Sequence, residues 1–246
     1  MSQYDEVFYD RLWQSENWGG KIINTDEEAR LQAIIRQIYI HILPSVEKDI
    51  SLRIVDVGCG RGWLTSVLSA YGSAMGIDST ETSITRARDL YPRCRFFVGD
   101  TKALLAAEGA GIADLVVSSE VIEHVPNENK PNFVRDIHSL LASGGHAILT
   151  TPRGELWSSW NKLGKERQPI EEWVTERELE TLCREAGFSI ISHQRIFLPG
   201  FVLNLPTRLL NMRVIRRAMG RILGKEIQKK INDYFGVYQV LLLKKA

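Results

Sequence analysis

Three glycines in a short stretch carry the clearest chemical signal in the chain. The segment VDVGCGRG (55–62) ends a β-branched run and places Gly58, Gly60 and Gly62 ahead of a helical pattern. Glycine permits positive φ and lets a ligand approach the backbone closely. The start of the following helix also offers N–H groups to an anionic group such as a carboxylate. We therefore expect a ligand at this loop, which includes Cys59, and the alternative is a tight turn without one.

The spacing of these glycines separates two kinds of ligand. In the dinucleotide fingerprint G-x-G-x-x-G, the third glycine would fall at position 63, which is Trp63. Asp56 lies two residues before the first glycine, where a carboxylate would repel a pyrophosphate and attract an ammonium group. The loop therefore favours an amino acid-like ligand, and it argues against the alternative of a nicotinamide dehydrogenase.

Two more aspartates end the next two predicted strands. Asp78 closes SAMGID, a place from which an acid can accept hydrogen bonds from both ribose hydroxyls. Asp100 closes FFVGD, where an adenine amino group would be read, and Thr101 follows it. Each acid alone is typical of a strand-end cap, but acids at the ends of three successive strands favour a binding site.

The segment SSEVIEHVP (118–126) follows the fourth predicted strand. Ligands of doubly wound sheets bind at the carboxyl ends of the strands, so we expect Glu120, Glu123 and His124 near the reacting group. The reference pKa of histidine lies near physiological pH, which suits His124 to be a general base on a substrate hydroxyl. The alternative is structural, a histidine that caps the strand end or bonds to the backbone.

Apolar runs alternate with amphipathic stretches along the chain, which predicts a parallel sheet with helices on both faces. Residues 1–50 have a helical pattern, and 199–236 form a connection far longer than the usual loop of about 4–6 residues. The expected strands are 53–57, 74–77, 95–98, 114–118, 146–150, 189–197 and 238–243. The expected helices are 63–71, 80–90, 102–107, 132–142 closed by Gly144-Gly145, and one opened by the capping box of Thr175 and Glu178.

Taken together, VDVGCGRG, GIDST, VGD and SSEVIEHV followed by GGHAILTTP resemble the motifs of class I S-adenosylmethionine-dependent methyltransferases. The resemblance covers about residues 50–198. It implies an α/β, Rossmann-like, doubly wound sheet of seven strands, with an antiparallel last strand between the fifth and the sixth. We expect a single domain (1–246), with a helical arm (1–50) and a helical lid (199–236) before the last strand.

The same resemblance implies S-adenosylmethionine as cofactor. Asp56 and Gly58 would lie near its methionine part, Asp78 at the ribose, Asp100 at the adenine, and Ser119 along the pocket. The full expected set of cofactor-binding residues is Asp56, Gly58, Cys59, Gly60, Gly62, Asp78, Ser79, Asp100, Thr101 and Ser119.

Within the family, SEVIEHVP is most similar to ubiquinone-biosynthesis O-methyltransferases, in which two glutamates and a histidine are associated with a divalent metal. The resemblance implies Glu120, Glu123 and His124 as ligands of Mg²⁺ or Zn²⁺. It also implies His124 and Glu123 as catalytic residues, and a hydroxyl of a small-molecule or lipid-linked acceptor as substrate. The chain departs from that group after Pro152. Nitrogen and carbon acceptors, and a non-catalytic S-adenosylmethionine-binding protein, remain alternatives.

Composition limits the partners and the compartment. The chain is 44% hydrophobic and 25% charged with a net charge of +1, so it is not a nucleic-acid-binding polycation. Three scattered cysteines without a C-x-x-C pair indicate a reducing compartment, and we expect a cytoplasmic protein. Residues 207–231 carry eight basic side chains and one acid beside an apolar face, typical of contact with an anionic membrane or of a solvated lid helix. Three tryptophans are expected to wall the acceptor pocket or to pack locally: Trp157, Trp160 and Trp173.

Overall fold

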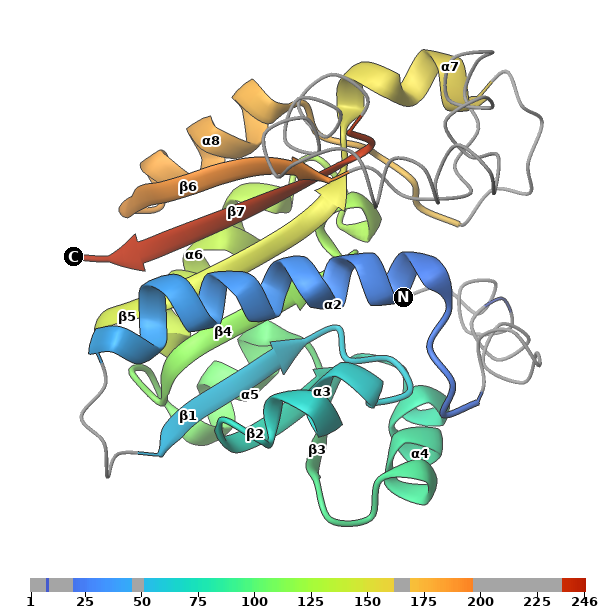
Figure 1. Ribbon diagram of the computed structural model, residues 1–246, viewed down its shortest axis with the longest axis vertical. Helices are drawn as coiled ribbons and strands as arrows, with labels where there is room; N and C mark the ends of the chain where they lie inside the picture. The colour runs from blue at the N-terminus through green and yellow to red at the C-terminus, as the bar shows by residue number, and fades with distance from the viewer. Residues whose placement is uncertain (1–7, 9–19, 46–50, 162–168, 197–235) are drawn as a thin grey trace, which may run out of the picture.

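A seven-stranded sheet with helices on both faces organises the computed structural model, which describes residues 8, 20–45, 51–161, 169–196 and 236–246 (Figure 1). The strand order is β3-β2-β1-β4-β5-β7-β6. Strand β7 pairs antiparallel with both β5 and β6, while the other pairs are parallel, which confirms the predicted topology. The strands are β1 (Leu52–Val57), β2 (Gly72–Asp78), β3 (Arg95–Val98), β4 (Ala113–Ser119), β5 (Leu141–Pro152), β6 (Phe188–Ile196) and β7 (Tyr238–Lys245).

Each face of the sheet has its own apolar core. Residues of α2 and α3 pack on one face, and residues of α5, α6 and α8 pack on the other. The helices are α2 (Thr25–Gln37), α3 (Trp63–Leu68), α4 (Glu81–Leu90), α5 (Thr101–Glu108), α6 (Lys130–Leu140), α7 (Trp157–Asn161) and α8 (Glu176–Glu185). Because strands β1 to β5 run parallel, their carboxyl ends lie at the same edge of the sheet, and the candidate site lies at that edge.

Strand β7 shows why its sequence folds this way. Side chains alternate between the faces of a strand with a period of two. Leu241 and Leu243 accordingly enter the core under α6 and α8, while Val240 and Leu242 enter the core under α2. Because both faces are covered, the strand is apolar throughout this run, which explains its clear signal in the sequence.

Several predicted boundaries differ from the structure. Helix α2 begins at Thr25, because Asn24 and Glu27 form a capping box, and a π-helical turn continues it over Ile38–Ile42. The helix expected over 63–71 ends at Leu68. Gly144 and Gly145 do not close a helix but lie within β5, next to a register shift against β4.

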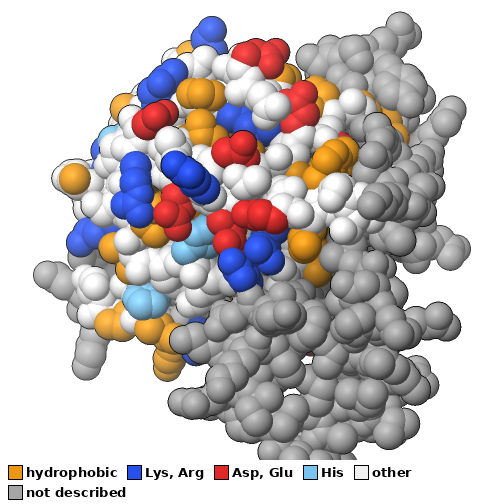
Figure 2. All heavy atoms as spheres, turned by 90° about the horizontal axis from the view of Figure 1, so that it is seen from above, with side chains coloured by type: hydrophobic (Ala, Val, Ile, Leu, Met, Phe, Trp, Pro, Cys, Tyr) orange, Lys and Arg blue, Asp and Glu red, His pale blue; other side chains and the backbone are white. Residues whose placement is uncertain are grey.

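The lid expected over 199–236 lies almost wholly outside the described residues, as does the first part of the arm expected over 1–50. Within the described part of the chain, no helix is both long and apolar enough to cross a bilayer. On the face seen in Figure 2, acidic and basic side chains of the described residues are interspersed.

Candidate functional site

The glycine loop between β1 and α3 has the shape that the sequence predicts. Gly58, Gly60 and Gly62 all have positive φ, at 70°, 50° and 80°. A Cβ at Gly58 would collide with the Val121 side chain, and one at Gly62 would lie 2.7 Å from the Phe96 ring. Only glycine therefore fits these positions, and the loop backbone can approach a ligand closely.

Asp78, at the end of β2, has acceptor capacity for a ribose. Its Oδ2 accepts the Gly60 N–H at 3.0 Å, and its Oδ1 accepts the Thr80 N–H at 2.9 Å. The Thr80 side chain bonds to the same carboxylate. An ionised carboxylate has about four lone-pair sites, so about one remains for a hydroxyl of a ligand. Burial raises the pKa of this carboxyl, and the hydrogen bonds from Thr80 and Gly60 oppose that shift. The side chain fits the expected cofactor and also shapes the loop; Ser79, which follows it, is exposed.

Asp56 in β1 and Cys59 within the glycine loop are both buried. Asp56 is 1% exposed, and the Thr65 hydroxyl of α3 donates to its Oδ2 at 2.6 Å. Burial raises the pKa of Asp56 to about 7, and Asp78 adds to the shift. The Cys59 N–H donates to the Ile77 carbonyl of β2. These bonds fix the two ends of the loop to its neighbours, and a direct contact of either residue with the cofactor stays a prediction.

The remaining expected cofactor residues lie at the ends of β3 and β4. Asp100 is exposed and caps α5 by accepting the Ala103 N–H. The Thr101 hydroxyl donates to Asp136 on α6, which directs it into the protein. Ser119 lies 2.9 Å from the Thr150 hydroxyl. The structure thus brings Asp78 and the glycines together directly, and places Asp100 at the neighbouring strand end.

Glu120 adopts an unusual backbone conformation where β4 ends. Its φ is 62°, the one positive value at a described residue other than glycine. Such strain is found at sites where the surrounding structure enforces it. Thr150 donates to Glu120 Oε1 at 3.0 Å, and the Tyr238 hydroxyl and the Arg30 charge also stabilise the carboxylate. Burial and the nearby Glu123 nevertheless raise the pKa of Glu120.

His124 has a defined tautomer. Its Nδ1 lies 2.7 Å from the Ile170 carbonyl oxygen. Because a carbonyl only accepts, Nδ1 must carry the ring proton of the neutral imidazole, which leaves the lone pair on Nε2. Burial lowers the pKa of His124, although the Ile170 carbonyl opposes the shift. The ring is therefore neutral near pH 7 and can accept a proton at Nε2.

Glu120, Glu123 and His124, the expected metal ligands, are bonded to protein groups. Glu123 is buried and accepts a hydrogen bond from Thr151 at 2.9 Å. Its Oε1 lies 4.0 Å from Nε2 of His124. In the described part of the chain, no three acidic, histidine or cysteine side chains converge on a metal position. Metal binding by these three residues stays a prediction.

Comparison with known proteins distinguishes a methyltransferase from a nicotinamide dehydrogenase. A model of the methyltransferase domain matches residues 27–193. The chain belongs to this family of methyltransferase domains. S-adenosylmethionine is accordingly its methyl donor, and the nicotinamide dehydrogenase alternative is excluded.

Individual relatives agree with this assignment. The chain is 28% identical over 211 residues to a ubiquinone biosynthesis O-methyltransferase of Roseobacter denitrificans, covering 78% of this chain and 81% of that protein. A protein of the same name from Caulobacter sp. (strain K31) is 36% identical over 104 residues, but the match covers 41% of this chain and 40% of that protein. The solved structure of N-methyltransferase NodS from Bradyrhizobium japonicum WM9, in complex with S-adenosyl-L-homocysteine, superposes with a TM-score of 0.66 at 15% identity over 98% of both chains. That likeness shows the shared fold.

A buried ion pair, not predicted from the sequence, ties α2 to the glycine loop of the methyltransferase. The Arg61 guanidinium bonds to both oxygens of Glu27, at 2.6 and 2.9 Å. It also donates to the carbonyls of Gly20 and Ile22. Both charged side chains are almost fully buried. The sequence contains two features that could have indicated this pair: Arg61 lies between two loop glycines, and Glu27 belongs to a capping box.

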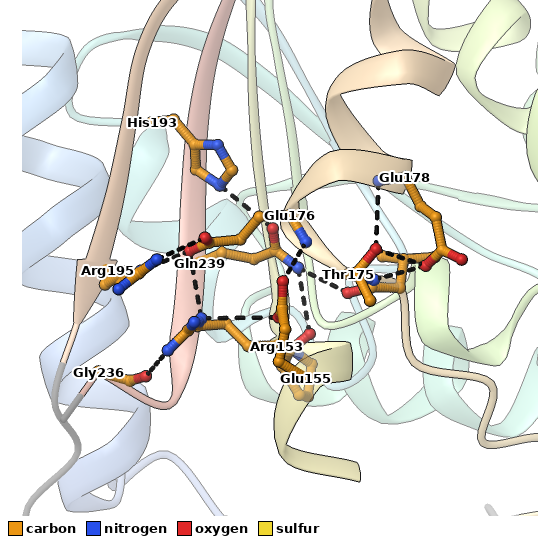
Figure 3. A network of polar contacts seen from close by, with 11 residues as sticks. Arg153, Glu155, Thr175, Glu176, Glu178, His193, Arg195, Gly236 and Gln239 are labelled. Atoms are coloured by element: carbon orange, nitrogen blue, oxygen red, sulfur yellow. Dashed lines mark hydrogen bonds and ion pairs between the residues drawn. The ribbon is translucent and has the colours of Figure 1, made fainter. Parts of the chain in front are cut away.

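A second polar network fixes the ends of β5, β6 and β7 in the methyltransferase (Figure 3). Arg195 forms a two-point ion pair with Glu176 at the start of α8, and Arg153 joins the same carboxylate at 3.1 Å. Arg153 also donates to the Gly236 carbonyl. Gln239 bridges the backbones of β5 and the segment before α8. This network holds Tyr238 in place beside Glu120.

The tryptophans after β5 pack on each other. The rings of Trp157 and Trp173 lie 5.2 Å apart in an edge-to-face arrangement. Such a pair stabilises local structure. The Trp160 side chain lies outside the described residues, and a role of these residues in walling the acceptor pocket stays a prediction.

Proposed function

We propose that this methyltransferase transfers the methyl group of S-adenosylmethionine to a hydroxyl oxygen, with His124 as the general base. The acceptor is a small or lipid-linked molecule. The observation that carries the proposal is the fixed tautomer of His124, whose Nδ1 faces the Ile170 carbonyl at 2.7 Å and whose Nε2 keeps its lone pair.

An oxygen acceptor makes the best use of this arrangement. A neutral hydroxyl is a weak nucleophile until its proton is removed, whereas an uncharged amine already has a nucleophilic lone pair. General-base catalysis of such a step typically contributes about 10²–10⁴-fold. The O-methyltransferase relatives support the same choice of acceptor atom.

The cofactor supplies an electrophilic methyl on its sulfonium centre. The glycine loop and Asp78 hold the donor, and the loop after β4 holds the acceptor at the adjoining strand end. Proximity and orientation of the two reactants then supply a large part of the rate enhancement. His124 takes the hydroxyl proton at Nε2 as the oxygen attacks. Glu123 supports the loop by accepting a hydrogen bond from Thr151.

The test is a comparison of His124→Ala with wild type. We expect turnover to fall by about 10²-fold or more, while the affinity for S-adenosylhomocysteine, measured by calorimetry, stays unchanged. His41→Ala is the matched control, because this histidine lies on the π-helical turn away from the site. Full activity of His124→Ala on a hydroxyl acceptor would refute the role of His124.

A further inference from the structure

The loop that carries His124 is bonded to the segment that precedes α8. The His124 ring donates to the Ile170 carbonyl at 2.7 Å. Two residues further along, the Glu172 N–H donates to the Glu123 carbonyl at 2.8 Å. The Glu172 carboxylate in turn accepts the Asn127 N–H at 2.7 Å. The carbonyl that sets the His124 tautomer therefore belongs to a segment held at three points along the loop.

Lys130 lies at the centre of these contacts. Its Nζ donates to the Glu172 carbonyl at 2.6 Å and to the Asn127 side-chain oxygen. The ammonium group is also 3.9 Å from the Glu172 carboxylate. Lys130 thus bonds to both sides of the junction, the His124 loop and the segment before α8.

Both the burial of Lys130 and its position at a helix start cost free energy. Its side chain is 2% exposed, and lysine is rarely buried unless it is paired. It is also the first residue of α6, where the positive end of the helix dipole disfavours a cation. The contacts to Asn127 and Glu172 offset these costs, so the position favours a cationic hydrogen-bond donor.

We propose that Lys130 and Glu172 are positioning residues that hold the Ile170 carbonyl against Nδ1 of His124 and so fix the tautomer of the base. The proposal rests on the function proposed above for His124. When the carbonyl shifts, the ring is able to place its proton on Nε2 instead. That tautomer has no lone pair at the nitrogen that accepts the substrate proton.

The direct test is ¹⁵N NMR of the ring nitrogens of His124 in the complex of the full chain with S-adenosylhomocysteine. In wild type near pH 7.5, we expect Nδ1 to have the shift of a protonated nitrogen and Nε2 that of an unprotonated one. Lys130→Met should move both shifts toward the values of a tautomer mixture. Lys130→Arg can donate to the same two oxygens and should retain most of the wild-type pattern.

Kinetics provides a second readout. Lys130→Met should lower kcat by about 10-fold, less than the loss of the base itself, and leave the affinity for S-adenosylhomocysteine unchanged. Lys102→Met, at an exposed lysine of α5, is the control and should behave as wild type. If Lys130→Met does not fold, Glu172→Ala replaces it, because it removes the acceptor of the Asn127 N–H and the side chain is 41% exposed, so the fold is expected to be preserved.

Wild-type nitrogen shifts in a folded Lys130→Met or Glu172→Ala protein would overturn the positioning role, whatever the activity. Changed shifts together with full activity of His124→Ala would confirm the positioning role and refute the proposed base. The two failures are therefore distinguishable.

Discussion

Replacement of Arg61 by methionine is expected to destabilise the methyltransferase strongly. The guanidinium bonds to both carboxylate oxygens of Glu27 and to two backbone carbonyls, and its side chain is 1% exposed. Removing one partner of a buried pair leaves the other charge without compensation, which costs about 3–5 kcal/mol. Methionine retains much of the packing volume, so the loss reports mainly on the polar contacts.

Urea unfolding with and without S-adenosylhomocysteine is the assay. We expect the free energy of unfolding to fall by about 3–5 kcal/mol in Arg61→Met. The affinity for S-adenosylhomocysteine should fall too, because Gly60 and Gly62 flank the substituted residue. Changing Glu27 to leucine in the same protein removes the orphaned carboxylate and should restore part of the stability, reduced by the lost capping contact to Asn24.

Arg53→Met is the matched control. Arg53 also forms a two-point pair, with Asp114, but this arginine is 51% exposed, so its loss should cost about 1 kcal/mol or less. Equal, small losses in the Arg61 and Arg53 variants would show that the Arg61 pair is solvated in solution. The account of α2 as an element fixed to the glycine loop would then fail.

Four further predictions concern Asp78, His124, Asp56 and the basic segment 207–231. Asp78→Ala should weaken S-adenosylhomocysteine binding by about 1.5–3 kcal/mol, the range for a hydrogen bond to a charged group, because the ribose loses its acceptor; unchanged affinity in calorimetry would contradict the ribose assignment. The pH profile of kcat/KM should lose activity on the acid side below the ordinary histidine value of 6.5, because burial lowers the pKa of His124 and the base must be neutral; an inflection above 6.5 would count against it. Burial holds the pKa of Asp56 at about 7 in the folded state, against an ordinary value of about 3.9, so the contribution of this carboxyl to stability is present below about pH 3.9 and is lost as the pH rises toward 7. In Asp56→Asn that part of the pH dependence, up to about 4 kcal/mol, should disappear, and parallel unfolding profiles for the two proteins would exclude it. Residues 207–231 should bring the full chain down with anionic vesicles at low salt and release it as salt rises; a chain that stays in solution at low salt would favour a solvated lid.

The fold was predictable because its strongest patterns are local. Short β-branched runs ending in glycine or aspartate fix the strands, and the position of the last strand followed from the family resemblance. The predicted ends of helices were wrong where a glycine pair has more than one structural role. At Gly144 and Gly145 the glycines lie inside a strand beside a register shift, and no sequence pattern distinguishes this from a helix end.

The candidate site was predictable in its residues but less so in its contacts. Asp78 and the loop glycines lie together because their strands are neighbours in the sheet. Glu123 and His124 bond to Thr151 and to the Ile170 carbonyl, which are distant in sequence, so spacing alone could not show these partners. Lys130 has no distinguishing pattern, since a lysine at a helix start is ordinarily solvated.

The most direct test of the central claim follows a labelled methyl group from the donor to the acceptor. The protein is incubated with S-[methyl-¹³C]adenosylmethionine and a panel of an alkyl catechol, an aliphatic alcohol and a primary amine, and the products are analysed by NMR and mass spectrometry. The account predicts a ¹³C-labelled methyl ether on a hydroxyl acceptor, formed by wild type and strongly reduced in His124→Ala. A label found on the amine nitrogen instead, or ether formation at the wild-type rate without His124, would contradict it.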